Sequence, residues 1–246
     1  MSAALALSGC ASAASSPQVA PPPRSVGMRL NFPLAKGLDS LPLVDSTGHT
    51  HRLSDFEGKV LVISDSMTLC QESCPLDTSS LVMTARAVDR SGKASDVEFL
   101  TITVDPRRDT TRRLAAYRKM FRPAPSNWLT LTGTPQHLAT LWKSLGVYVH
   151  RVPSDTPAPR DWMTGKPLTY DVQHSDEVFF LDTSGRERFL LDGIPYVGKA
   201  SSVPSRLYRF MSEKGRRNVH RGRGSDWTPA QAERVVDWLD QPSVSS

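Results

Sequence analysis

Two continuous apolar runs constrain the fold of this 246-residue chain more than any other feature. Residues 59–65, KVLVISD, and 97–105, VEFLTITVD, are rich in β-branched side chains, with apolar residues in succession. Strands that are buried on both faces of a sheet have this composition, because other layers cover both of their faces. A chain with two such strands therefore needs a layered α/β fold around a central sheet.

Four helix starts can be placed from capping signals. Each combines a capping side chain or a proline with apolar positions in the residues that follow. They lie at Cys74–Pro75, at Asp109–Thr110 for a helix to about Phe121, at Thr134–Pro135, and at the capping box that begins with Thr228.

Shorter strands surround the two buried runs. Hairpins are predicted at 41–56 and 177–193, where apolar stretches flank the turns STGH and TSGR. Single strands are predicted at 128–133 and 147–152, and the proline-rich region 153–169 is predicted to be a loop. Strands that alternate with helices, together with antiparallel hairpins, predict an α/β sandwich with a mixed central sheet and an N-terminal hairpin.

The chain is long enough to bury a core, and its positive charge is local. Hydrophobic residues make up 39% of the sequence, and no run approaches the roughly 18 apolar residues of a membrane span. The formal net charge is +5, but 206–223 holds seven Lys or Arg and one acid and so contributes +6. This local cluster does not indicate a nucleic-acid partner. We predict a solvated basic loop at 201–227, with contact to anionic lipid headgroups as the functional alternative, and a C-terminal helix and tail at 228–246.

The first ten residues end in LSGC, which resembles a bacterial lipobox. We interpret residues 1–10 as a truncated-looking lipoprotein signal, because no Lys or Arg precedes Cys10 and the apolar stretch is short. Residues 11–30 are rich in Ala, Ser and Pro, which predicts a disordered tether. Together these features predict an extracytoplasmic protein that is anchored to the bacterial cell membrane by lipid on Cys10.

Two further cysteines, Cys70 and Cys74, lie where a buried strand ends and a helix begins. This edge of an open α/β sheet is the usual place for a functional site, and a helix N-terminus favours thiolate over thiol. Residues i and i+4 face the same way, with Cα atoms about 6 Å apart. The pair could therefore form a structural disulfide, act as a redox couple or share a metal ion. The spacing alone leaves all three open.

A histidine ligand would separate these possibilities, because thiolates with imidazole suit copper or zinc. His174 lies in a loop that leads directly into a buried strand, and it is either bonded to the backbone there or a metal ligand. The other histidines have ordinary interpretations. We predict that His137 is solvated at a helix start, that His150 is packed on a strand and that His220 belongs to the basic stretch. His49 and His51 share one strand face, where a metal could bind adventitiously.

Six motifs occur in order across residues 41–192. The stretch LVDSTGHTHRLSDFEGKVLVI is followed by TLCQESCP, TVDPRRDT, LTGT, YDVQHS and FFLDTSGR. In this order the chain resembles the SCO/SenC proteins, thioredoxin-fold copper-binding factors that serve assembly of the CuA centre of cytochrome c oxidase. The resemblance implies a thioredoxin-like three-layer sandwich at 31–200. It also implies that Cys70, Cys74 and His174 bind copper, as Cu(I) or Cu(II).

The resemblance also implies partners and a role. The partners would be the oxidase subunit that carries CuA and other envelope copper or thiol proteins, with no nucleic acid among them. The implied role is that of a metallochaperone rather than an enzyme. The alternative is a thiol–disulfide reductase of cell-envelope cysteines, in which Cys70 and Cys74 would be the redox-active pair.

One motif contains two acidic residues and a proline that match a turn of the family, namely Asp105, Pro106 and Asp109. We predict that this turn has a structural role in helix capping. The sequence departs from the family pattern beside the ligands. Gln71 stands where many members have proline, and Gln173 stands where they have an acid. These departures predict a changed redox potential or partner docking, while all three ligands are kept.

Overall fold

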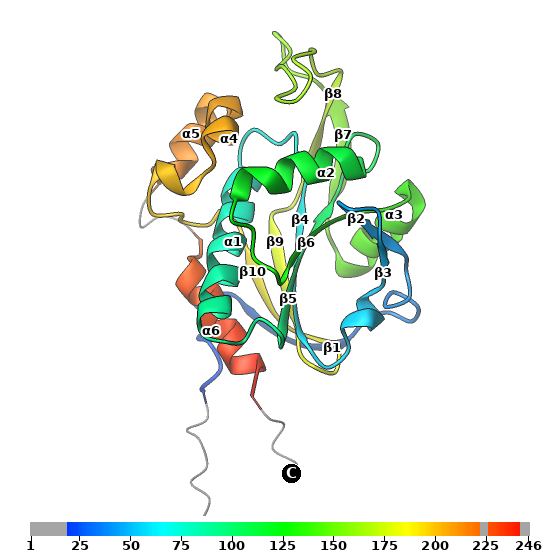
Figure 1. Cartoon of the computed structure of the whole chain (residues 1–246), viewed down its shortest axis with the longest axis vertical. Helices are drawn as coiled ribbons and strands as arrows, with labels where there is room; N and C mark the ends of the chain where they lie inside the picture. The colour runs from blue at the N-terminus through cyan, green and yellow to red at the C-terminus, as the bar shows by residue number, and fades with distance from the viewer. Residues whose placement is uncertain (1–18, 222–225, 242–246) are drawn as a thin grey trace, which may run out of the picture.

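The computed structural model describes residues 19–221 and 226–241 (Figure 1). An eight-stranded sheet has the order β1-β10-β9-β4-β5-β6-β2-β3. Its strands are β1 Met28–Pro33, β2 Leu43–Asp45, β3 Thr50–His51, β4 Val60–Ser66, β5 Val97–Thr103, β6 Trp128–Thr132, β9 Glu177–Leu181 and β10 Arg186–Asp192. A separate two-stranded sheet is formed by β7 Val149–Pro153 and β8 Tyr170–His174.

Helices connect these strands and cover the sheet. The α-helices are α1 Cys74–Arg90, α2 Thr111–Arg118, α3 Pro135–Leu145, α4 Ser205–Phe210, α5 Glu213–Val219 and α6 Pro229–Leu239. Single 3-10 turns are η1 Leu53–Phe56, η2 Lys119–Phe121 and η3 Ala200–Ser202. The four capping signals of the sequence each correspond to one of the longer helices, α1, α2, α3 and α6.

The sheet is mixed, as predicted. Strand β5 pairs in parallel with both β4 and β6, whereas β9 runs antiparallel to β4. Every residue of β4 and β5 is buried, because each strand has a neighbour on both edges and a packed layer on both faces. Strands β2 and β3 form the predicted N-terminal hairpin.

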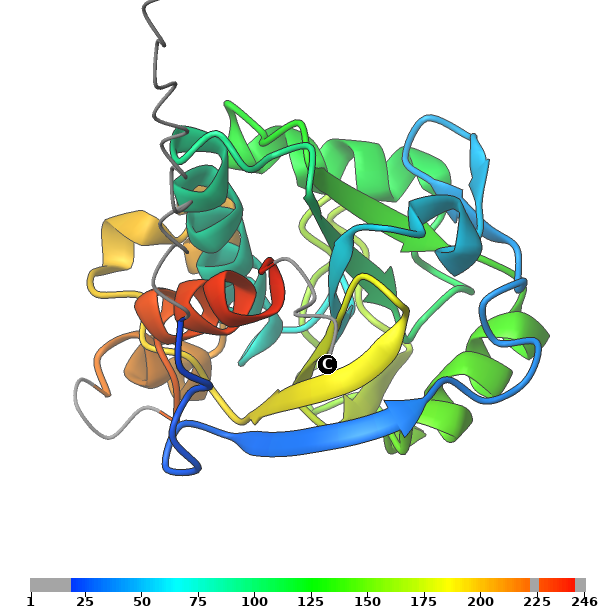
Figure 2. The ribbon, with the colours of Figure 1, turned by 90° about the horizontal axis from the view of Figure 1, so that it is seen from below.

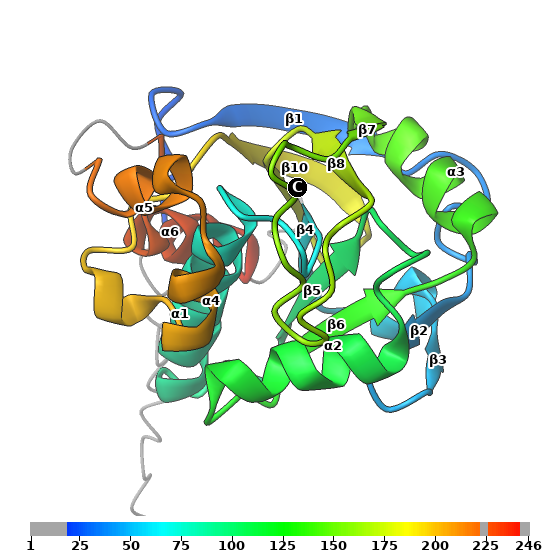
Figure 3. The ribbon, with the colours of Figure 1, turned by 90° about the horizontal axis from the view of Figure 1, so that it is seen from above.

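Successive residues of the central strands enter two different cores. Val62 belongs to the core beneath α1 and α6, whereas the next residue, Ile63, belongs to the core beneath α3 and β8. In Figure 3, α1 and α6 lie on one side of the central strands and α3 lies on the other. This arrangement gives three layers, which confirms the predicted sandwich.

Two predicted boundaries are wrong. Strand β1 begins at Met28, inside the predicted tether 11–30, because it pairs along β10 at the edge of the sheet (Figure 2). The predicted basic loop 201–227 contains α4 and α5. The many basic residues of this segment made its apolar pattern difficult to recognise. Leu207, Phe210 and Val219 are buried in the same core as α1.

The described chain ends meet far from the start of α1. Val19 and Gln241 are joined by two hydrogen bonds, Val19 N to Gln241 Oε1 at 2.9 Å and Gln241 Nε2 to Val19 O at 3.0 Å. Every helix in the described ranges is too short or too polar to span a bilayer. Cys10 lies outside the described residues, so the predicted signal and lipid anchor stay predictions.

Candidate metal centre

The loop between β4 and α1, residues 67–73, carries the first cysteine, and we call it the metal loop. Thr68 fixes its start: the Thr68 N–H donates to Asp109 at 3.0 Å, and the Thr68 hydroxyl donates to the same carboxylate. The indole N–H of Trp162 donates to the Thr68 carbonyl at 2.7 Å. Asp109 therefore acts as a tether of the metal loop, whereas the cap of α2 is Thr110. Its predicted role in capping is wrong, because its side chain is buried beneath this loop.

Cys70 and Cys74 lie at the N-terminal end of α1, where backbone N–H groups have no partner within the helix. Cys74 is the first residue of α1, and Cys70 lies one turn before it. The Cys70 sulfur accepts from Cys74 N at 3.4 Å and from Glu72 N at 3.5 Å. Both thiols are free and buried, with 7% of Cys70 and none of Cys74 exposed. Cys70 is therefore the more exposed residue of the pair.

His174 joins the pair from a distant part of the chain. It is the last residue of β8, where it pairs with Val149 of β7, rather than a loop residue. Its Nε2 lies 3.3 Å from the Cys74 sulfur. One donor atom from each of Cys70, Cys74 and His174 lies within 4.8 Å of the other two. Among the described residues, this is the only group of three or more Cys, His, Asp or Glu side chains that is close enough to hold a metal ion.

Asp65, near the end of β4, fixes the orientation of the His174 ring. His174 Nδ1 lies 2.5 Å from Asp65 Oδ2 and 2.6 Å from the Ser175 carbonyl. Both neighbours are acceptors, so Nδ1 carries a proton, and Nε2, once it loses its own proton, presents its lone pair toward Cys74. The second Asp65 oxygen accepts from Glu177 N at 2.9 Å. A carboxylate behind a histidine in this way is the usual second partner of a metal-bound imidazole.

The two thiols are not equivalent. The neighbouring Cys74 side chain lowers the pKa of Cys70 well below its ordinary value, against the effect of burial. Burial raises the pKa of Cys74, and the negative charge of Cys70 raises it further. For His174, burial alone would lower the pKa, but the hydrogen bonds to Asp65 and Cys70 and the negative charges of these two groups together outweigh burial, so the net pKa is raised. Without metal, the site therefore favours a Cys70 thiolate beside a protonated imidazole.

Two more carboxyl groups surround the donors. Burial raises the pKa of Asp77 well above its ordinary value, and the neighbouring Asp176 adds to the shift. Burial likewise raises the pKa of Asp176 to about 6, although Asp176 accepts a 2.6 Å hydrogen bond from the Ser73 hydroxyl. Acids that are difficult to ionise because they are buried near one another indicate a site that a cation would stabilise.

The other histidines do not join this site. His51 Nε2 lies 3.0 Å from Asp45 Oδ2, and the His51 ring stacks on Phe56, remote from the thiols. His150, predicted to be packed, is exposed on β7. It stacks on Tyr148, because the two-stranded sheet leaves that face uncovered.

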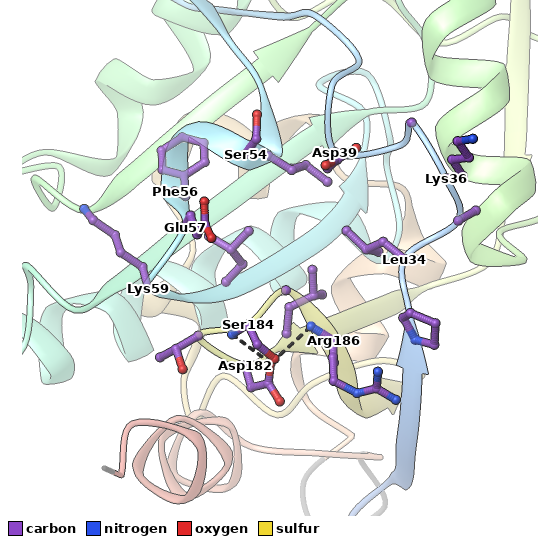
Figure 4. Close-up of a pocket in the computed structure, with 18 residues that line it drawn as sticks. Leu34, Lys36, Asp39, Ser54, Phe56, Glu57, Lys59, Asp182, Ser184 and Arg186 are labelled. Carbon is purple, nitrogen blue, oxygen red and sulfur yellow. Dashed lines mark hydrogen bonds between the residues drawn. The ribbon is translucent and has the colours of Figure 1, made fainter. Parts of the chain in front are cut away.

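A hollow of about 600 Å³ lies at the opposite end of β4 from the metal loop (Figure 4). It mixes opposite charges, including Glu57, Lys59 and Arg186. The Asp182 carboxylate in this hollow already accepts hydrogen bonds from the backbone N–H groups of Ser184 and Arg186. The hollow does not indicate a ligand class and is separate from the thiols.

Sequence reasoning predicted the three residues that the structure brings together and missed the residues that hold them in place. Asp65 carried a usable signal, because a charged side chain inside a buried apolar run requires a partner. Trp162 carried none, because it lies in an irregular loop 94 residues from Thr68 in the chain.

Comparisons with known proteins find a matching family model and curated relatives. The family model of SCO1/SenC matches residues 38–209. The chain is 30% identical over 151 residues to the mitochondrial SCO2 homolog of Bos taurus, which covers 61% of this chain and 52% of that protein. The chain thus spans about half the length of this curated relative.

Two solved structures are similar in fold. Apo Sco1 from Thermus thermophilus has 26% identity and a TM-score of 0.52, covering 68% of this chain and 86% of that one. A SCO1/SenC family lipoprotein from Bacillus anthracis str. Ames has 24% identity and a TM-score of 0.53, covering 68% and 88%. Both confirm the predicted fold class.

Proposed function

The chain belongs to the SCO1/SenC family, and from this premise we propose that it is a metallochaperone that binds one copper ion and delivers it to the CuA site of cytochrome c oxidase. The observation that carries the proposal is the convergence of Cys70, Cys74 and His174 within 4.8 Å. His174 reaches the cysteines across 100 residues of sequence. A structural disulfide would need no such histidine.

The donor set suits copper. Two thiolates and one imidazole are soft and borderline ligands, which favour Cu(I) and also hold Cu(II) or zinc. Asp65 keeps the proton on Nδ1 of His174 and leaves Nε2 to the metal. Binding requires that both thiols and Nε2 lose their protons, so copper affinity should fall as the pH falls.

Oxidation would switch the site off. In exchange with the disulfide of an envelope protein, a bond would form between the two sulfurs while that disulfide accepts two electrons and two protons, and two of the three ligands would be lost. Copper binding is then restricted to the dithiol form, which couples metal loading to the redox poise outside the cytoplasm.

A second candidate function, reduction of envelope disulfides, is favoured by the difference between the two thiols. The more exposed Cys70 has the lowered pKa of an attacking thiolate. It would attack a substrate disulfide, and Cys74 would resolve the mixed disulfide. The substrate would gain two electrons and two protons, and the pair would be left oxidised.

Partners and location follow from the same premise. We propose that the oxidase subunit that carries CuA accepts the copper, and that other envelope copper or thiol proteins exchange metal or electrons with this chain. Anchoring through lipid on Cys10 would hold the protein on the outer side of the bacterial cell membrane. The likeness to a lipoprotein of the same family supports this location.

An anaerobic titration of the reduced full chain with Cu(I) tests the proposal. We expect one copper per chain, held against a competing chelator, and loss of binding after oxidation of the two cysteines. His174→Ala should weaken Cu(II) binding and remove the imidazole contribution from its spectrum. Unchanged Cu(II) affinity in this variant would contradict the assigned site.

The same variants separate the two functions. A reductase needs Cys70 and Cys74 but does not need His174. Loss of disulfide reduction in Cys70→Ser with full retention in His174→Ala would therefore favour the reductase, provided that His174→Ala also leaves copper binding unchanged.

A further inference from the structure

The segment from α4 to α5 lies directly against the metal loop. The Ser212 N–H donates to the Gln71 carbonyl at 3.0 Å, and the Gln71 side-chain amide donates to the Phe210 carbonyl at 2.9 Å. Gln71 is thus held through both its main chain and its side chain. The residue directly after Cys70 is therefore a donor to the C-terminal part of the chain.

Gly215 brings α5 into contact with the same loop. A Cβ atom at this position would lie 2.1 Å from the Gln71 carbonyl oxygen and 3.0 Å from the Glu72 Cα. Backbone atoms cannot yield to such an overlap without moving the loop or the helix. Lys214 adds an ion pair with Glu72 at 2.6 Å, although the Lys214 side chain is 65% exposed and the pair contributes little.

The segment is anchored in the protein core rather than lying loosely on the surface. Leu207, Phe210, Met211 and Val219 belong to the core that α1 and α6 share. Residues 210–219 lie beyond the end of the family match at residue 209. Outside the matched range, the chain therefore has a packed element that contacts the loop carrying Cys70.

A single peptide unit links this element to the sulfur. The carbonyl of the Gln71–Glu72 peptide accepts from Ser212, and the N–H of the same peptide donates to the Cys70 sulfur at 3.5 Å. In a planar trans peptide these two groups point in opposite directions. Holding the carbonyl on one side therefore aims the N–H at Cys70 on the other.

We propose that residues 210–215, which we call the loop clamp, position Cys70 in the metal centre by fixing the Gln71–Glu72 peptide. Ser212 and Gly215 are positioning residues, since neither touches the metal. The inference rests on the proposed copper site. It adds that the C-terminal extension holds the loop in its metal-binding conformation and slows the release of copper.

Two substitutions at one residue isolate the contact. Ser212 has φ −63° and the preceding Met211 has ψ 143°, so proline fits the backbone. Ser212→Pro replaces the N–H by a ring carbon that points at the Gln71 carbonyl. Ser212→Ala keeps the N–H and, like proline, removes the hydroxyl that accepts from Gly215 N. The alanine variant is therefore the matched control.

The first measurement is the rate at which Cu(I) leaves the reduced full chain, with bicinchoninate as the competing chelator. Ser212→Pro should release Cu(I) about tenfold faster than Ser212→Ala, as expected if loss of the bond to the Gln71 carbonyl misaligns the hydrogen bond from Glu72 N to the charged Cys70 sulfur. The thiolate-to-Cu(II) charge-transfer band should shift in the proline variant only. Equal rates and equal spectra in the two variants would overturn the proposal.

The second measurement uses the metal-free chain, so that it does not depend on copper. Amide hydrogen exchange across residues 67–76 should be faster in Ser212→Pro than in Ser212→Ala. If the unmodified chain binds no copper, the proposed function fails while the exchange comparison still decides whether the clamp holds the loop. If Ser212→Pro does not fold, Gly215→Ala must reproduce the faster release and exchange, and failure to do so overturns the clamp.

Discussion

Asp65 is a buried carboxylate near the end of the fully buried strand β4, and His174 is the side chain that compensates for it. Burial of an unpaired charge would cost several kcal/mol. The cost is offset by two hydrogen bonds, one from the imidazole and one from Glu177 N. A purely apolar residue would suit β4 better, so the function of this carboxylate is to orient the ligand.

Replacing Asp65 by Asn should therefore reduce copper affinity by about 10- to 100-fold, the usual effect of losing a partner of a metal-bound histidine. Chelator competition on the reduced chain measures this change. Asp45→Asn is the control, because Asp45 contacts His51 in the same manner at a site without thiols. Equal losses in the two variants would mean that general destabilisation, and not ligand orientation, explains the result.

Asp109 makes stability depend on pH. Burial raises its pKa from 3.8 to about 6, despite hydrogen bonds from Thr103 and Thr68. The folded chain therefore binds more protons than the unfolded chain between these values, so a rise in pH favours unfolding. The difference corresponds to about 3 kcal/mol.

We expect the stability of the unmodified chain relative to Asp109→Asn to fall by up to about 3 kcal/mol between pH 3.8 and pH 6, and to change little above. Urea unfolding of both chains across this range measures the difference, in which the other titrating groups cancel. A difference that rises with pH would show that Asp109 is an ordinary ionised tether.

The motif order of the sequence was sufficient to predict Cys70, Cys74 and His174 as donors. It was not sufficient to predict Asp65 as the partner of His174, because 109 residues separate them and no local pattern encodes which acceptor a ring faces. Asp109 was correctly given a structural role, but its side chain was expected to cap a helix and instead bonds to the metal loop. Capping signals are local, whereas its actual donors come from β5 and the metal loop.

At the scale of elements, the periodicity of the sequence predicted most of the central sheet and the longer helices. Buried strands and capped helices are specified by neighbouring residues, so β4, β5, α3 and α6 could be predicted. The short helices α4 and α5 could not, because their apolar positions are interspersed with Arg and Lys and each has fewer than eight residues. Such helices depend on tertiary packing.

Residues 149–174, which contain β7 and β8 and which we call the arm, also hold the metal loop in place. Trp162 of this arm donates to Thr68, and the adjacent Asp161 forms a bidentate pair with Arg113 of α2 at 2.9 and 2.6 Å. The metal loop is therefore connected to both the arm and α2, which are far apart in sequence.

Trp162→Phe keeps an aromatic ring but leaves the Thr68 carbonyl without its donor. We expect a loss of about 1–3 kcal/mol in unfolding free energy and a weaker hold on copper, measured by urea unfolding and chelator competition. Trp238→Phe is the control, because Trp238 packs on Phe189 and its indole has no hydrogen-bond partner among the described residues. A larger loss in the control would contradict the assigned role of the indole.

At the scale of the whole molecule, α1 spans the distance between the metal loop and the chain ends. Its first residue is Cys74, and beyond its last turn Lys93 pairs with Asp237 and Asp240 at the end of α6. A helix of 17 residues is about 25 Å long. The metal loop and the ends at Val19 and Gln241 therefore lie at opposite poles, as Figure 1 shows.

The proposed anchor can be tested by producing the full chain in bacterial cells that process lipoproteins. Cys10→Ser should move the protein from the membrane fraction to the soluble envelope fraction without changing copper stoichiometry, because Cys10 is remote in sequence from the three donors. Fractionation followed by immunoblotting measures the distribution. A membrane-bound Cys10→Ser protein would contradict lipid attachment at this residue.

The meeting of Val19 with Gln241 sets the distance from the membrane over which cargo would be presented. Nine residue steps from Cys10 to Val19 can extend at most about 30 Å, so a lipid there would hold the pole of the chain ends within about 30 Å of the bilayer. This reach exceeds the length of α1, about 25 Å, so the folded domain can turn on its tether. The thiols would then reach an acceptor in the same membrane whether its receiving site stands above the headgroups or level with them.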